Sequence, residues 1–213
     1  MASYNVAQIL SLMDEHGQPE MGDYSFTPKD MLVALALFKV HQPSRVLEFG
    51  VCQGHTAAFL LSRCPFVEQY VGVDLRPELF RNRGIVPRVA GKLAIHDARF
   101  STLLTDESVE DFERQLRGEG IGHHWFDCII IDANHEDWAT KRDTEACDSL
   151  LTPGGMWLWH DYDVESRQHS NGRPFTLKRY LDDLISGGRR IRTPVDTDRD
   201  PWTCCSLAWE VKR

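Results

Sequence analysis

The stretch RVLEFGVCQG, from Arg45 to Gly54, decides the fold of this chain of 213 residues. It passes from a short apolar strand into a turn that carries Gly50 and Gly54. Aliphatic runs of this kind are typical of buried parallel strands, and glycines mark places where the backbone turns sharply or approaches a ligand. Glu48, near the end of the strand, costs free energy to bury unless a partner donates hydrogen bonds to it. The stretch therefore predicts a ligand-binding loop of the nucleotide type.

From Arg45 onward, apolar strand-like runs alternate with helical segments. The predicted strands are residues 45–49, 70–74, 92–96, 126–132 and 155–160, and the predicted helices are residues 54–63, 77–82, 106–117, 136–151 and 175–186. Such alternation predicts a parallel sheet covered on both faces. Two further strands, 189–195 and 204–212, follow without a helix between them and should pair antiparallel. We predict an α/β, Rossmann-like, doubly wound sheet of about seven strands, mostly parallel, with a reversed C-terminal hairpin and helices on both faces.

The residues before this alternation predict helices. Apolar residues at helical spacing in residues 5–13 indicate a short leading helix. Thr27, Pro28 and Asp30 form a typical helix start, because threonine caps, proline suits the first turn and a carboxylate suits the amino end. That second helix is unusually apolar to about Val40, as for a helix packed on a sheet or a partner chain. We expect residues 1–43 to form a helical segment packed on the core domain of residues 44–213, and a homodimer contact through these helices.

Composition excludes several classes of protein. The chain has 24 basic and 32 acidic residues and a formal charge of −8, which disfavours nucleic acid as a partner. A basic run between residues 178 and 192 is interpreted as a solvated face. The six cysteines form no CxxC pair, which is typical of reduced cysteines in a cytosolic protein. No secretory signal and no apolar run of membrane-spanning length are visible, so we expect a cytoplasmic protein without a membrane partner.

Acidic residues follow the predicted second and third strands. Asp74 ends the second strand, where an acid binds ribose hydroxyls in dinucleotide folds. Asp97 and Ala98 follow the predicted third strand, where they would face an adenine edge. Both acids also have a simpler interpretation, because aspartate often stabilises turns.

Two acid and histidine clusters follow the predicted fourth and fifth strands. Asp132 precedes His135 by three residues, and His160 directly precedes Asp161. Carboxylates from adjacent strand ends suit a hard divalent cation such as Mg²⁺, which would lower the pKa of a substrate hydroxyl. His135 would then serve as a general base, since the ordinary pKa of histidine lies near neutrality. In the simpler alternative, Asp132 caps the following helix and His135 lies in its first turn.

Together these motifs resemble the class I S-adenosylmethionine-dependent methyltransferases over residues 27–213. EFGVCQG matches the family's acid and glycine-rich turn, Asp74, Asp97 and Asp132 match its strand-end acids, and LLTPGG at residues 150–155 matches its turn before strand five. The resemblance implies that residues 44–213 bind S-adenosylmethionine. It implies a set of cofactor-binding residues that comprises Glu48, Gly50, Gly54, Asp74, Asp97, Ala98 and Asp132.

A narrower resemblance connects the chain with O-methyltransferases of the macrocin and mycinamicin type. There the fourth-strand acid and a fifth-strand carboxylate pair hold Mg²⁺, and the histidine after strand four is the base. The resemblance implies His135 and Asp132 as catalytic residues and a hydroxyl of a small or sugar-like molecule as the acceptor. It implies a divalent-cation site of Asp132 and Asp161, with His160 where the macrolide enzymes carry a second acid. Since an imidazole suits Zn²⁺ or Fe²⁺ better than Mg²⁺, the identity of the metal stays open.

Three other functions compete with this interpretation. An NAD-dependent oxidoreductase is disfavoured by Glu48 and by the absence of a GxGxxG motif. A non-catalytic binding module with the same fold is disfavoured by the retained acids and His135. A nucleic-acid methyltransferase is disfavoured by the net charge and by the absence of an Asn/Asp-Pro-Pro-aromatic motif.

Overall fold

The computed structural model describes residues 26–82, 89–162, 174–194 and 205–213. The predicted leading helix, residues 5–13, lies outside these residues. The loop that connects the two strands of the predicted C-terminal hairpin, residues 196–203, lies outside them as well. The elements, in chain order, are α2 (Pro28–His41), β1 (Arg45–Phe49), α3 (His55–Arg63), β2 (Gln69–Leu75), α4 (Pro77–Asn82), β3 (Phe100–Thr105), α5 (Val109–Gly118), β4 (Phe126–Ile131), α6 (Asp137–Cys147), η1 (Asp148–Leu150), β5 (Leu151–Trp159), α7 (Leu177–Ser186) and β6 (Ala208–Val211).

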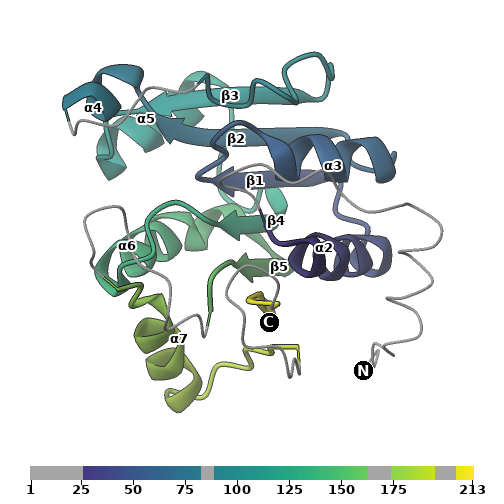
Figure 1. The fold of residues 1–213 in the computed structure, drawn as a ribbon, viewed down its shortest axis with the longest axis vertical. Coiled ribbons are helices and arrows are strands. Elements are labelled where there is room, and N and C mark those ends of the chain that lie inside the picture. Colours follow the sequence, from purple (N-terminus) through teal and green to yellow (C-terminus); the bar gives the residue numbers. More distant parts are fainter. Residues whose placement is uncertain (1–25, 83–88, 163–173, 195–204) are drawn as a thin grey trace.

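The strands form one sheet in the order β3-β2-β1-β4-β5-β6 (Figure 1). All neighbours pair parallel except β5 and β6, which pair antiparallel. The chain moves outward from β1 to β3 and then returns to β4 on the other side of β1. In such sheets the ligand binds at the carboxyl ends of the strands, where this order reverses. The prediction of a mostly parallel, doubly wound sheet with a reversed last strand is confirmed.

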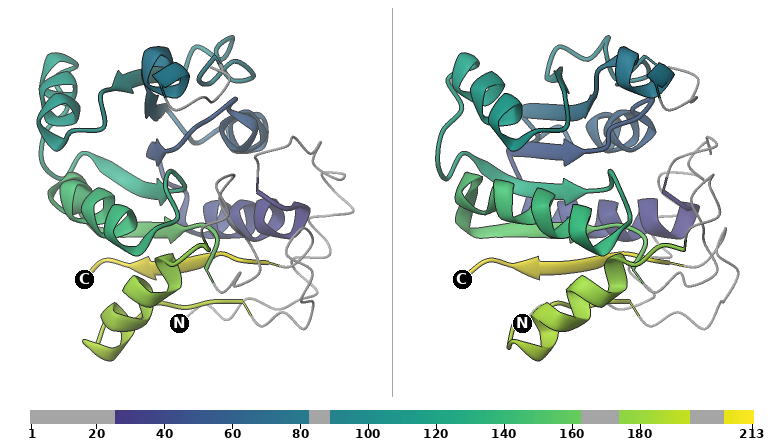
Figure 2. Two further views of the ribbon diagram at one scale, coloured as in Figure 1. Left: turned by 60° about the vertical axis from the view of Figure 1, so that its left-hand side comes forward. Right: turned by 90° about the vertical axis from the view of Figure 1, so that its left-hand side faces the viewer.

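Each face of the sheet has its own core. Side chains at alternate strand positions, such as Val46 and Ile130, pack with helices α2 and α3. The intervening positions, such as Leu47 and Ile129, pack with α5, α6 and α7. Figure 2 shows these two layers of helices on opposite sides of the strands. This alternation follows from the two-residue period of a strand, because both faces of a central strand must be apolar when helices cover both.

Helix α2 is buried along most of its length. Thr27 caps it through a capping box, in which the Thr27 side chain accepts from Asp30 N–H and the Asp30 side chain accepts from Thr27 N–H. All residues from Asp30 to Phe38 are buried, and most of the apolar ones belong to the core beneath α2 and α3. None of the helices in the described ranges is long and apolar enough to cross a membrane.

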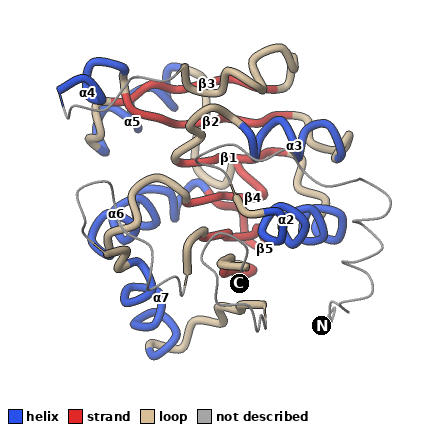
Figure 3. Tube along the Cα trace, in the orientation of Figure 1, coloured by secondary structure: helices blue, strands red, loops and turns tan. Residues whose placement is uncertain are grey.

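The predicted third strand, residues 92–96, is wrong. This segment consists of turns, and β3 begins only at Phe100 (Figure 3). The apolar side chains of Leu93 and Ile95 that favoured a strand are 45% and 56% exposed, whereas Phe100 and Leu103 lie in the cores. The segment instead hydrogen bonds to the first loop, because Leu93 N–H donates to the carbonyl of Gln53.

The predicted strand at residues 189–195 is reduced to one antiparallel bridge between Arg192 and Trp209. The described part of the chain therefore holds a six-stranded sheet rather than a seven-stranded one. The last strand is shorter than the predicted 204–212, since β6 covers only Ala208–Val211.

Candidate functional site

The loop after β1 lies in close contact with the loop after β4. Gly50 has a φ of +88°, and a Cβ atom there would lie 2.3 Å from the carbonyl oxygen of Asp132. Gly50 N–H donates to the carbonyl of Val73 in β2. Gly54, with a φ of +84°, precedes α3, and a Cβ atom there would lie 3.0 Å from Gly91. Only glycine fits such positions without strain, so both predicted glycines hold the loop against its neighbours.

Asp74 fixes the same loop from β2. One of its carboxylate oxygens accepts a hydrogen bond from Cys52 N–H at 2.8 Å, and the other accepts from Leu75 N–H at 2.7 Å. Burial raises the pKa of Asp74, and these two hydrogen bonds partly offset the effect. A carboxylate oxygen accepts more than one hydrogen bond, so Asp74 retains acceptor capacity for ligand hydroxyls.

Glu48 is buried beneath the loop, with 1% of its surface exposed. The hydroxyl of Tyr70 in β2 donates to its Oε2 atom at 2.9 Å. Burial, together with the charge of Asp132, raises the pKa of Glu48 to about 8. The predicted cost of burying Glu48 is therefore offset by protonation and by Tyr70 in the ligand-free protein.

His160, directly after β5, lies between two carboxylates. Its Nδ1 is 2.7 Å from Asp132 Oδ1, and its Nε2 is 3.1 Å from Asp30 Oδ2. The ring of Phe26 stacks on the imidazole with centroids 4.2 Å apart. Burial would lower the pKa of His160, but the charges of Asp132 and Asp161 and the two hydrogen bonds raise it well above its ordinary value. His160 is thus a buried imidazole whose two ring nitrogens both face carboxylates.

His135 and Asp161 complete the group of polar residues after β4 and β5. His135 Nε2 lies 3.4 Å from Asp161 Oδ2, and the ring of Phe175 packs against His135 with centroids 4.3 Å apart. The carbonyl of His135 accepts hydrogen bonds from the N–H groups of Thr176 and Leu177, which tie it to the start of α7. Asp161 has a φ of +63°. A non-glycine residue in this region is strained, and such strain is common at functional sites.

Asp132, His135 and Asp161 form the potential metal-binding group. One ligand atom from each side chain lies within 4.8 Å of the others. Two carboxylates and an imidazole are a donor set that suits a divalent cation. His160 was predicted as a further ligand, but both of its ring nitrogens face carboxylates. A metal ligand needs an unprotonated nitrogen, so a role of His160 as a ligand, which stays a prediction, would require its contact with Asp132 or Asp30 to open.

Asp97 and Ala98 do not lie where the sequence predicted. Both precede β3 instead of following it, so they belong to the amino end of that strand. Asp97 pairs with Arg99 at 2.6 Å, and Arg99 donates to the carbonyls of Leu61 and Val67 around the end of α3. Ala98 is exposed. The positions of Asp97 and Ala98 were predicted wrongly because the third strand was placed at residues 92–96 instead of Phe100–Thr105. The contacts of Asp97 with Arg99 fit its simpler interpretation, an acid that stabilises a turn.

Sequence reasoning missed two members of the site, Asp30 and Tyr70. The sequence does carry a signal for Tyr70. It lies in the strand beside β1 and pairs with Val46, which shares one face of the sheet with Glu48. Asp30 was recognised only as a helix-start residue. No local pattern connects it with His160, which is 130 residues away.

The tryptophans of β5 and α6 differ in their burial. Trp157 and Trp159 are fully buried and stack with ring centroids 5.5 Å apart. They belong to the core on the face that α6 and α7 cover. Trp138 is 53% exposed.

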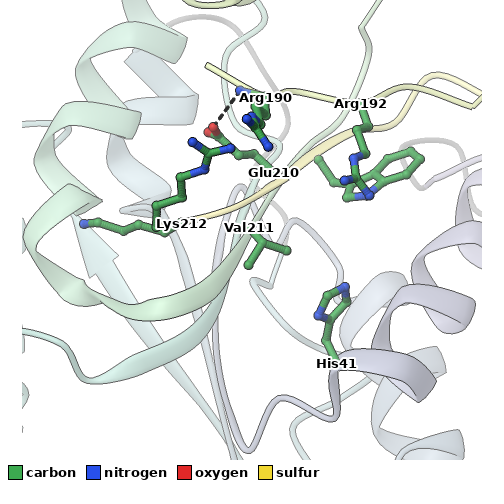
Figure 4. A pocket seen from close by; sticks show the side chains of 8 residues that line it. His41, Arg190, Arg192, Glu210, Val211 and Lys212 are labelled. Carbon is green, nitrogen blue, oxygen red and sulfur yellow. Dashed lines mark hydrogen bonds between the residues drawn. The ribbon is translucent and has the colours of Figure 1, made fainter. Parts of the chain in front are cut away.

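A hollow of about 260 Å³ lies at the opposite edge of the sheet, between the end of α2 and β6 (Figure 4). Its lining includes His41, Arg190, Arg192 and Val211 and none of the residues predicted for cofactor or metal binding. Arg190 and Arg192 are exposed, as expected for the basic run.

Comparison with protein families gives one match over more than half of the chain. A family model described as "Methyltransferase domain" matches residues 47–162, which span β1 to the end of the site after β5. Among curated proteins, none matches the sequence significantly.

Comparison with solved structures identifies the same fold in O-methyltransferases. An O-methyltransferase from Bacillus cereus in complex with SAH has a TM-score of 0.62 and 16% identity, covering 97% of this chain and 90% of that chain. TomG from Streptomyces achromogenes, an O-methyltransferase in complex with SAM, has a TM-score of 0.60 and 14% identity, covering 100% and 92%. MycE from the mycinamycin pathway, in complex with Mg and SAH, has a TM-score of 0.57 and 20% identity, covering 96% and 55%. At these identities the resemblance shows the fold.

Proposed function

The chain belongs to the methyltransferase-domain family, and from this premise we propose that it transfers the methyl group of S-adenosylmethionine to a hydroxyl group of a small molecule. The observation that carries the proposal is the convergence of Asp132, His135 and Asp161 beside the loop that Gly50 and Asp74 hold in place. Solved neighbours with SAM or SAH bound support the cofactor.

The cofactor would lie along the carboxyl ends of β1 and β2. Asp74 would accept hydrogen bonds from the ribose hydroxyls, and the loop of residues 50–54 would lie against the methionine portion. The carboxyl groups of Asp74 and Asp132 lie beside this loop, and their negative charge suits a cationic sulfonium. We do not assign the adenine to Asp97. At the carboxyl ends of the strands, the neighbour of Asp74 on the β3 side is the end of β3, at Thr105 and Asp106.

His135 is the proposed general base. Methyl transfer from a sulfonium is a direct displacement, so the protein must align the acceptor and remove its proton. Asp161 lies 3.4 Å from His135 Nε2, and its negative charge would stabilise the imidazolium that forms. The contact of the His135 backbone with α7 and the packing of Phe175 restrict the ring.

A divalent cation fits the same residues. Asp132 and Asp161 would hold it, and His135 would stay unligated beside it as the base. When bound, such a cation would lower the pKa of an acceptor hydroxyl. The neighbour MycE was solved with Mg, which supports a cation of this type.

Calorimetric titration with S-adenosylhomocysteine tests the cofactor. We expect binding in the micromolar range for the natural chain and a loss of at least about tenfold, or 1.4 kcal/mol, for Asp74→Ala. Lys92→Ala, an exposed change outside the site, is the matched control and should bind as the natural chain does. Absence of binding to the natural chain would refute the proposed function and favour a non-catalytic module.

Transfer of radioactive methyl groups to a panel of sugar, phenol and aliphatic alcohols tests the acceptor. Product formation with hydroxyl compounds, and none with matched amines or thiols, is the expected result. Titration with Mn²⁺, followed by electron paramagnetic resonance, tests the cation independently of turnover. Asp161→Asn should weaken Mn²⁺ binding, whereas equal binding by both proteins would remove the metal from the proposal.

A further inference from the structure

Helix α2 contributes a fully buried carboxylate to the site from outside the matched family region. Asp30 has no exposed surface. Its Oδ1 accepts from Ser206 N–H at 2.7 Å, and its Oδ2 accepts from the Thr27 hydroxyl at 2.8 Å. The same Oδ2 lies 3.1 Å from His160 Nε2. Asp30 therefore joins the amino end of α2, the segment before β6 and the end of β5.

A capping box alone does not require such burial. Acids at this position of a helix stabilise the amino end equally well at the surface. A buried carboxylate is expensive unless it is paired and hydrogen bonded. The carboxylate of Asp30 accepts from Thr27 and Ser206 and faces His160 Nε2, and these three contacts together offset the cost of its burial.

The imidazole of His160 is restricted from three sides. Asp30 faces Nε2, Asp132 faces Nδ1, and Phe26 stacks on the ring with planes 16° apart. Each ring nitrogen lies within hydrogen-bond distance of a carboxylate oxygen, so the imidazole is held at both of its polar atoms. His160 Nδ1 in turn hydrogen bonds to Oδ1 of Asp132. This contact restrains the carboxylate of Asp132 within the potential metal-binding group of Asp132, His135 and Asp161.

We propose that Asp30 is a positioning residue of the methyl-transfer site, because it fixes the imidazole of His160, which in turn fixes the carboxylate of Asp132. The proposal rests on the proposed function for its catalytic consequence. Helix α2 is then part of the site and more than a cover for the sheet. Partners that orient the groups in contact with the reaction typically change activity by about 10- to 100-fold when removed.

The test compares Asp30→Asn with Thr27→Ala. Thr27→Ala removes the hydroxyl that donates to Asp30 Oδ2 and accepts from Asp30 N–H, but it leaves the carboxylate opposite His160 in place. Asp30→Asn replaces that carboxylate with an amide and keeps the Thr27 hydroxyl. Proton NMR of the ligand-free protein reports the first step directly. We expect two slowly exchanging imidazole N–H protons, assigned to His160 by their loss in His160→Gln. Both should remain in Thr27→Ala, and the Nε2 proton should exchange faster in Asp30→Asn, because an amide oxygen is a weaker acceptor than a carboxylate.

Methyl-transfer kinetics report the second step. Asp30→Asn should lower kcat by about 10- to 100-fold while the KM and the affinity for S-adenosylhomocysteine stay within about twofold of the natural chain. Thr27→Ala should keep kcat within about twofold. In the double variant Asp30→Asn/His160→Gln the losses should not add, because the two residues act through one another.

Equal kcat values and equal ring-proton spectra for Asp30→Asn and Thr27→Ala would overturn the proposal. Additive losses in the double variant would overturn it as well. A natural chain that binds no S-adenosylhomocysteine would refute the proposed function instead. The NMR comparison would then still decide whether Asp30 holds His160, since it needs no ligand.

Discussion

Glu48 shows how a single buried carboxyl group makes stability depend on pH. Its pKa is raised to about 8 by burial and by Asp132, so the folded protein holds a proton that the unfolded chain releases above pH 4.5. Between these two values the folded state binds more protons, and the free energy of unfolding therefore falls as pH rises. Below pH 4.5 Glu48 is protonated in both the folded and the unfolded state, so its contribution to the free energy of unfolding is constant.

We predict that Glu48→Gln removes this dependence, since glutamine resembles the neutral acid and its amide oxygen can accept from Tyr70. The stability of the variant relative to the natural chain should grow as pH rises from 5 to 8, by at most about 1.4 kcal/mol per pH unit. Urea unfolding at a series of pH values measures the difference. Parallel stability curves would show that Glu48 is ionised in the folded protein.

His135 is the residue on which catalysis should depend most directly. We predict that His135→Gln retains binding of S-adenosylhomocysteine but loses about 10²- to 10⁴-fold in kcat, the usual contribution of a general base. His123→Gln, an exposed loop histidine, is the matched control. Turnover that survives in His135→Gln at the natural rate would eliminate His135 as the base.

At the scale of elements, the close approach of the β1 and β4 loops depends on Gly50. We predict that Gly50→Ala destabilises the protein by more than Gly154→Ala. Both glycines have positive φ values, +88° and +80°, but a Cβ atom at Gly154 meets no atom within 4 Å. Gly154→Ala thus reports the cost of the backbone conformation alone, about 1–2 kcal/mol.

The excess cost of Gly50→Ala reports the contact with the Asp132 carbonyl, and the displaced loop should also weaken binding of S-adenosylhomocysteine. Urea unfolding and calorimetry of both variants make the comparison. Equal losses of stability would show that the loop relaxes freely and that its contact with the β4 loop is unimportant.

Sequence patterns predicted most elements because the signals are local. Strand β1 has the predicted bounds, and α3 and α4 agree with them within one residue. The third strand was missed although a signal existed. Ser108 caps an amphipathic helix that begins at Val109, so the preceding strand should end just before it, as Phe100–Thr105 does. The contact between Asp30 and His160 could not be predicted, because it arises only when α2 packs across the finished sheet.

At the scale of the whole molecule, the site joins segments that are far apart in the chain. The ends of β1, β2, β4 and β5 meet there with the amino end of α2, whereas the hollow at His41 and Arg192 lies at the opposite edge. A cofactor bound at the carboxyl ends of the strands would connect segments that must all be folded. Its binding free energy should therefore stabilise the whole protein against unfolding.

We predict that S-adenosylhomocysteine at about 100 times its Kd raises the free energy of unfolding by about 2.7 kcal/mol. Amide hydrogen exchange should slow most in the loops at residues 50–54 and 132–135, and the backbone pair of Arg192 and Trp209 should stay unchanged beyond the global effect. Asp74→Ala should reduce both effects together, because the stabilisation and the local protection have one origin. Selective protection around Arg192 and Trp209 would instead place the ligand in the hollow at the opposite edge, and the assignment of the cofactor to the carboxyl ends of the strands would be wrong.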